Sequence, residues 1–400
     1  LVLAALALLL ALSLAGCLWP ALLVRTVAPS WRGQQLDLAL ALERWLAINI
    51  LLLGAQALLA ARLNAARRFH WAPLAAGLPA AAVVAVLATT RSWPLASRVL
   101  AIAVGLTAGS ALGTALMLAA VLRLPPARPL PRDGPQPGGS SKPTPASVRS
   151  LGTLVAAMGV LNLVPWGERV VASALGAGAV AALDYGQRLV LFLFGLSVAP
   201  FTAVVFTRLS ELNASAAPAR GPRQSMDADL SSAFLLQLEN GLRAVLVAVL
   251  PAAAGLAVFP SLITRCVYGW GRFGAASLAA TAPVVGILGA GLGLDAAFYY
   301  LLFALYARQR SGAKLPLALL LAAVNLPLAW LGGHAWGVAG IAGAHVASTL
   351  CALAWLAWRC PAYFPGLRWR RTLRAAAAAA ALSLSAALAA RMLIPSPALA

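Results

Sequence analysis

The stretch VLAIAVGLTAGSALGTALMLAAVL, residues 99–122, runs for 24 positions without a charged side chain. A membrane-spanning helix needs about 20 consecutive, mostly apolar residues. In hydrocarbon, only helices and closed barrels satisfy every backbone polar group internally, and this stretch lacks the alternation of a barrel strand. It therefore predicts a transmembrane α-helix.

Ten further runs share this pattern. The eleven predicted spans are roughly residues 1–24, 39–61, 73–90, 99–122, 151–176, 179–207, 244–264, 276–307, 315–332, 336–358 and 372–394. Of the 400 residues, 62% are hydrophobic and 10% are charged, which is more apolar than a soluble domain of this size could bury. We predict an all-α polytopic membrane protein with about 11 transmembrane helices.

The basic residues predict an orientation. A nucleic-acid-binding protein would gather its positive charge on a soluble face, whereas the net charge of +20 here arises in short loops between apolar runs. Twenty Lys and Arg residues lie in the loops after spans two, four, six, eight and ten, and seven lie in the alternate loops and at the C-terminal end. Cytoplasmic loops are enriched in Lys and Arg, so the first set, with Arg67, Arg68 and Lys142, is predicted to be cytoplasmic and to face membrane lipids.

A linker divides the chain. Residues 124–149 hold eight prolines together with several Gly and Ser residues, a composition that stays extended. The linker separates an N-terminal bundle of four spans, residues 1–123, from a C-terminal bundle of seven, residues 150–400, as in transporters that rock one bundle against another. The chain opens inside an apolar run, without Met or a basic leading region, so we expect a fragment.

Few ionisable side chains lie within spans, where each must be paired, face water or act in function. Glu168 and Arg169 lie in span five, and one interpretation is that they only reach the outer interface. Arg188 follows Gln187 in the turn into span six and precedes an apolar run. Its guanidinium could hold a phosphate with two parallel hydrogen bonds.

Three more polar residues lie within later spans. Asp295 in span eight is expected to be protonated or paired with a basic group from another helix, with a proton relay as the functional interpretation. Asn325 in span nine and His345 in span ten are more often packing residues than ligands. The four cysteines, Cys17, Cys266, Cys351 and Cys360, lack metal-ligand spacing, so we interpret them as packing residues.

The acidic residues argue against an enzyme. A membrane-embedded glycosyltransferase would need acids at a membrane border to bind metal or act as a base. The ten Asp and Glu residues are scattered, and the one Asp-x-Asp pair, Asp227 and Asp229, lies in a polar cytoplasmic stretch. We expect no catalytic residues, no cofactor and no certain metal site.

Several segments resemble the MviN/MurJ family, lipid II flippases of the multidrug/oligosaccharidyl-lipid/polysaccharide exporter superfamily. Residues 168–189, ERVVASALGAGAVAALDYGQRL, resemble that family's helix seven and the start of helix eight. Smaller matches, in the family's order, are LNAARRF (63–69), GLRAVLVAVLPAAAGL (241–256), the loop with Tyr268, Gly271 and Phe273, and ALYAR (304–308) followed by Pro316. On this register the eleven spans are helices three to thirteen, without two opening helices and a final one.

The resemblance implies two pseudo-symmetric bundles around a central cavity in the bacterial inner membrane. An undecaprenyl-pyrophosphate-linked headgroup, that of lipid II, would cross this cavity by alternating access, with the cell-wall synthesis machinery as a partner. Arg188 matches the arginine that contacts the pyrophosphate, and Arg169 and Gln187 are its expected neighbours. Glu168 matches an acid of a cation site, Asn325 a second ligand, and His345 and Asp295 complete the expected ion-coupling set.

The sequence departs from the family at this cation site. Ala329 stands where an acid is usual, His345 where a threonine is usual, and Gln187 where an aspartate precedes the arginine. Coupling to sodium, to protons or to the membrane potential therefore stays open. Three alternatives also stay open: an exporter of another polyprenyl-linked glycan such as an exopolysaccharide or O-antigen unit, a drug/cation antiporter of the superfamily, and a degenerate paralogue without transport.

Overall fold

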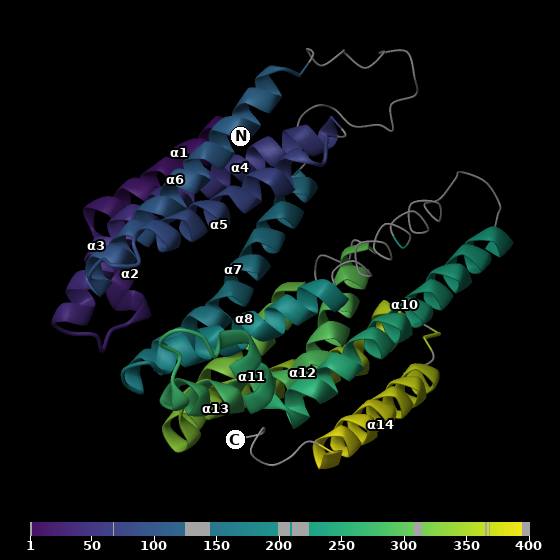
Figure 1. Cartoon of the computed structure of the whole chain (residues 1–400). Helices are drawn as coiled ribbons and strands as arrows, with labels where there is room; N and C mark the ends of the chain where they lie inside the picture. Colours follow the sequence, from purple (N-terminus) through teal and green to yellow (C-terminus); the bar gives the residue numbers. More distant parts are fainter. Residues whose placement is uncertain are drawn as a thin grey trace, which may run out of the picture. The chain divides into compact units, whose positions relative to one another are not determined.

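Every element in the described part of the chain is a helix, which confirms the predicted all-α class (Figure 1). The computed structural model describes residues 2–66, 68–124, 145–198, 209, 224–307, 314–364, 366–367 and 369–393. The chain forms two compact units, Leu1–Ser140 and Ser141–Ala400. Most of the predicted linker lies outside the described residues, and its last positions, from Pro145, are already helical.

The first unit is held together by a glycine strip on its last helix. Its helices are α1 (Val2–Leu18), α2 (Pro20–Val27), α3 (Gln34–Leu46), α4 (Ile48–Ala65), α5 (Trp71–Thr89) and α6 (Leu95–Leu122). Gly105, Gly109 and Gly113 recur every four residues on α6 and face α5, so closely that a Cβ at Gly109 would lie 2.6 Å from Pro79 Cα. Small residues at this spacing let membrane helices pack backbone to backbone.

The second unit has α12 at its centre. Its helices are α7 (Pro145–Ala174), α8 (Ala179–Ser197), α10 (Gln224–Val258), α11 (Pro260–Tyr268), α12 (Ala275–Ala307), α13 (Lys314–Tyr363) and α14 (Trp369–Leu393). α12 packs against α8, α10, α11 and α13, and α7 packs against α13. Val284, Val285, Leu288 and Leu292 on α12 are almost fully buried, so this helix forms the apolar core against which α8, α10, α11 and α13 pack.

α13 is a helical hairpin rather than one long helix. Its backbone leaves the helical region at Trp336 and Gly337, where Gly337 has φ 61°, a conformation that glycine adopts without strain. The Asn325 amide donates a hydrogen bond of 3.2 Å to the Ser348 hydroxyl. In a straight helix those residues would lie ~35 Å apart, so the chain must fold back between them.

The same helix break occurs once in each unit. Leu18-Trp19-Pro20 ends α1 and starts α2, and Val258-Phe259-Pro260 ends α10 and starts α11. Trp19 has φ −123° and ψ 57°, and Phe259 has φ −121° and ψ 44°. A residue before proline is driven out of the α-helical region, while proline suits the first turn of the next helix. The repeated break agrees with two pseudo-symmetric units.

The predicted count of eleven spans is compatible with the helices. Eight helices in the described residues are long and apolar enough to cross a membrane, or nine if the bent pair α1 and α2 is one span. The count reaches eleven if the two limbs of α13 are counted separately and α7, which carries Glu168 and Arg169, is added. The residues around Arg188 differ from the prediction, because they lie inside α8 and the turn precedes them at residues 175–178.

Candidate functional site

Glu168 is the centre of a buried polar cluster, which contradicts the interpretation that it only reaches the interface. Its side chain is 1% exposed. Gln187 Nε2 donates to its Oε2 at 2.7 Å, and Asn325 Nδ2 donates to its Oε1 at 3.0 Å. His345 Nδ1 lies 3.1 Å from the same Oε1. The partners come from α8 and from both limbs of α13, so this carboxylate ties three segments to α7.

His345 also connects Glu168 to a second acid. The other ring nitrogen, His345 Nε2, lies 3.6 Å from Asp295 Oδ1 on α12. One turn after His345, the Thr349 hydroxyl donates to Asp295 Oδ1 at 3.0 Å. The structure thus brings the four predicted ion-coupling residues, Glu168, Asn325, His345 and Asp295, into one cluster. Their role in coupling stays a prediction.

The predicted substrate-binding residues separate into different environments. Gln187 turns toward Glu168 and belongs to the buried cluster. Arg169 Nε forms an ion pair with Asp184 at 3.0 Å, and its Nη1 donates to the Pro165 carbonyl one turn earlier on α7. Because Asp184 already neutralises this guanidinium, Arg169 has less positive charge to offer a phosphate than an unpaired arginine.

Among the described residues, Arg188 has no ion-pair partner. It is the central residue of α8, nine positions from either end, and lies on the exposed face with Tyr185 and Phe192. In the described part of the chain no carboxylate pairs with it. An unpaired charge halfway along a spanning helix must meet water or an anionic ligand rather than lipid.

Three aromatic rings gather beside Arg188. Tyr185, Tyr268 and Phe273 have ring centroids 5.0 to 5.8 Å apart, and the Tyr268 hydroxyl donates to the Tyr185 carbonyl at 3.1 Å. Partial burial raises the pKa of Tyr268, while the positive charge of Arg188 acts in the opposite direction. The loop after α11 therefore reaches the face of α8 that carries Arg188.

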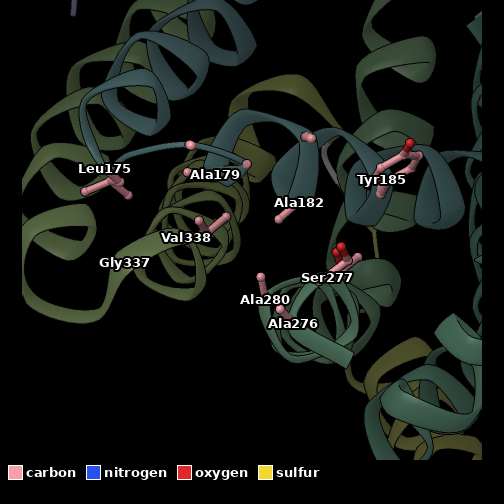
Figure 2. A pocket seen from close by; sticks show the side chains of 13 residues that line it. Leu175, Ala179, Ala182, Tyr185, Ala276, Ser277, Ala280, Gly337 and Val338 are labelled. Carbon is pink, nitrogen blue, oxygen red and sulfur yellow. The ribbon is translucent and has the colours of Figure 1, made fainter. Parts of the chain in front are cut away.

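A small cavity lies at the end of α8 where the helix begins. Its volume is about 370 Å³, and Figure 2 shows Ala179, Ala182 and Tyr185 of α8 across from Ala276, Ser277 and Ala280 of α12, with Val338 of α13 nearby. The Thr281 hydroxyl in its lining is buried without a hydrogen-bond partner. Sequence reasoning missed this cavity because alanine-rich helix ends carry no distinctive motif.

Sequence reasoning also missed Ser348 and Thr349 as members of the cluster. Both lie one turn after His345, and residues three and four positions apart share a helix face. That spacing was the available signal. Within the described residues, no group of three or more His, Cys, Asp and Glu side chains is arranged to hold a metal ion.

The chain matches one protein family and resembles several solved structures. The family model described as lipid II flippase MurJ matches residues 1–396. A solved structure of a lipid II flippase MurJ in an inward closed conformation has a TM-score of 0.77 and 17% identity, covering 98% of this chain and 76% of that one. No curated protein sequence matches.

Two other solved structures are similar in fold. An inward-facing multidrug resistance transporter of the MATE family, in the MOP superfamily, has a TM-score of 0.66 at 14% identity, covering 90% of this chain and 80% of that one. A MATE transporter of Vibrio cholerae has a TM-score of 0.57 at 14% identity, covering 89% and 76%. At these identities the likeness to solved structures shows the fold alone.

Proposed function

This chain belongs to the MurJ family of lipid II flippases, and from that premise we infer that it moves lipid II across the membrane. Its many apolar helices make it a multi-pass membrane protein. In finer terms, the headgroup on its undecaprenyl pyrophosphate crosses the bacterial inner membrane by alternating access, without a covalent change. The cell-wall synthesis machinery on the outer side then uses the product.

The observation that carries the proposed mechanism is the Arg188 guanidinium at the centre of α8, which no carboxylate of the described residues pairs. A pyrophosphate that enters a low-dielectric cavity loses hydration and needs a fixed positive charge. Arginine keeps its charge at any physiological pH and presents two parallel donors that match two phosphate oxygens. We therefore propose Arg188 as the pyrophosphate contact.

The other transport hypotheses have less support. The likeness to MATE transporters is one of fold, at 14% identity, and carries no substrate to this chain. An exporter of another polyprenyl-linked glycan would use the same pyrophosphate contact, because the phosphates and the tail are common to such lipids. Only the sugar headgroup distinguishes lipid II from these other lipid-linked glycans.

The test is lipid flipping in proteoliposomes that contain the full-length protein. The parental protein should translocate fluorescent lipid II faster than a polyprenyl-pyrophosphate glycan without the peptide. Arg188→Ala should lower the lipid II rate at least tenfold, since a hydrogen bond between charged groups contributes about 1.5–3 kcal/mol. Arg188→Lys should keep partial activity, because lysine retains the charge and loses the fork.

The matched control is Arg272→Ala, which removes an exposed arginine from the loop beside the aromatic rings. It should flip at the parental rate. If Arg188→Ala also flips at the parental rate while folding normally, Arg188 is not the pyrophosphate contact. Equal rates for all polyprenyl-linked glycans would instead contradict the lipid II assignment.

A further inference from the structure

Two carboxylates of the second unit share one imidazole. The side chain of Glu168 on α7 is 1% exposed, that of Asp295 on α12 is 13% exposed, and that of His345 on α13 is 31% exposed. Glu168 in particular needs partners, because a buried charge without them is strongly unfavourable. The groups that face His345 from the surrounding elements are these two acids. Asn325 donates to the same Glu168 oxygen that the ring faces, and Gln187 donates to the other oxygen.

The two nitrogens of the His345 ring each face a different acid. Nδ1 lies 3.1 Å from Glu168 Oε1, and Nε2 lies 3.6 Å from Asp295 Oδ1. A carboxylate oxygen accepts hydrogen bonds, so Nδ1 is best placed as a donor to Glu168. The ring therefore stands between the two carboxylates, with one nitrogen toward each.

The same residues do not fit the sodium site that the family resemblance implies. A hard cation takes several oxygen ligands. Here Asn325 presents its nitrogen to Glu168 Oε1, and a ring nitrogen of His345 occupies the same oxygen. Ala329 is fully buried and brings no side-chain oxygen. Asn325 Oδ1 is buried and has no hydrogen-bond partner among the described residues, but it belongs to the amide whose nitrogen faces Glu168.

We propose that the His345 ring fills the place of a cation between Glu168 and Asp295, so that this site takes no sodium ion and transport does not depend on sodium. A side chain tethered to α13 then stands where an exchangeable ion would bind, between α7 and α12. Ala329 and His345, the two departures from the family pattern, act together: the first removes an oxygen ligand, and the second places a ring nitrogen at the Glu168 oxygen.

Sodium binding by the purified full chain tests this proposal without any lipid substrate. Thermal unfolding is compared in NaCl and in choline chloride at equal ionic strength and pH, because an ion that binds only the folded state raises Tm. The parent should unfold at the same Tm in both salts. The double variant Ala329→Asp/His345→Thr should gain a saturable, sodium-specific rise of a few degrees.

Two further measurements keep the outcome clear. If the double variant does not fold, binding of radioactive sodium to the parent decides the question, and saturable binding there overturns the proposal. Lipid II flipping by the parent should proceed at equal rates with sodium and with choline. The inference rests on the proposed function only in this last arm. Absent flipping in both salts therefore counts against the flippase assignment. Flipping only with sodium counts against the proposal that His345 takes the place of the cation.

Discussion

At the scale of single residues, two buried threonines of the second unit differ in their hydrogen bonds. Thr349 and Thr281 are both threonines in the second unit and are 3% and 1% exposed. The Thr349 hydroxyl donates to the Asp295 carboxylate, whereas the Thr281 hydroxyl has no partner. The two positions therefore separate the contribution of a hydrogen bond from that of burial.

We predict that Thr349→Val lowers the free energy of unfolding by about 1–3 kcal/mol, because it removes the hydroxyl that donates to the Asp295 carboxylate at 3.0 Å. Thr281→Val should be neutral or slightly stabilising, because it removes a buried hydroxyl that bonds to nothing. Reversible unfolding in mixed micelles measures both variants against the parent. Equal destabilisation of the two would mean that the Thr349 bond contributes nothing.

At the scale of elements, the hairpin of α13 depends on two glycines that face each other. A Cβ at Gly340 would lie within 3 Å of the backbone of Gly332, whereas a Cβ at Gly343 on the same limb would meet nothing within 4 Å. The close approach brings Asn325 and Ser348 to hydrogen-bond distance. The hairpin thus positions Asn325 and His345 on the same side of Glu168.

We predict that Gly340→Val separates the limbs and lowers both the yield of folded protein and its Tm. Gly343→Ala on the same limb should leave both unchanged or slightly raise Tm, because alanine favours helix and the site is open. The comparison needs only size-exclusion profiles and thermal unfolding of the two variants. A Gly340→Val protein as stable as the parent would show that the limbs do not pack backbone to backbone.

At the scale of the whole molecule, the distribution of Lys and Arg predicts which loops face the cytoplasm, and this orientation can be measured directly. In a variant without native cysteines, Arg68→Cys should resist a membrane-impermeant maleimide in intact spheroplasts and react after lysis. The control is a second variant that keeps Cys266 as its single cysteine. Cys266 is exposed on α11, near the predicted outer end of a span, so it should react before lysis. The reverse pattern would overturn the orientation.

The sequence predicted the class of fold and several members of the buried cluster. It did not predict which side chains form hydrogen bonds with one another. Hydropathy located the spans because lipid permits only continuous apolar helices, and the family resemblance singled out Glu168, Asn325 and His345. The contacts between individual side chains depend on how each helix is rotated about its axis and how deep it lies in the membrane. Helix packing sets both, and the sequence alone does not reveal them. For this reason Gln187, expected beside the substrate, instead donates to Glu168, and the pairing of Arg169 with Asp184 was not predicted.

The tight turn of α13 has a consequence for the biosynthesis of the protein. Only Trp336 and Gly337 depart from helical geometry, so almost no polar chain has to be translocated between the two limbs. A limb that entered lipid alone would expose the amide of Asn325 or the hydroxyl of Ser348. When both limbs enter together, these two groups form a hydrogen bond with each other. The insertion machinery should therefore release the two limbs into the bilayer as a pair, after the second limb has left the ribosome.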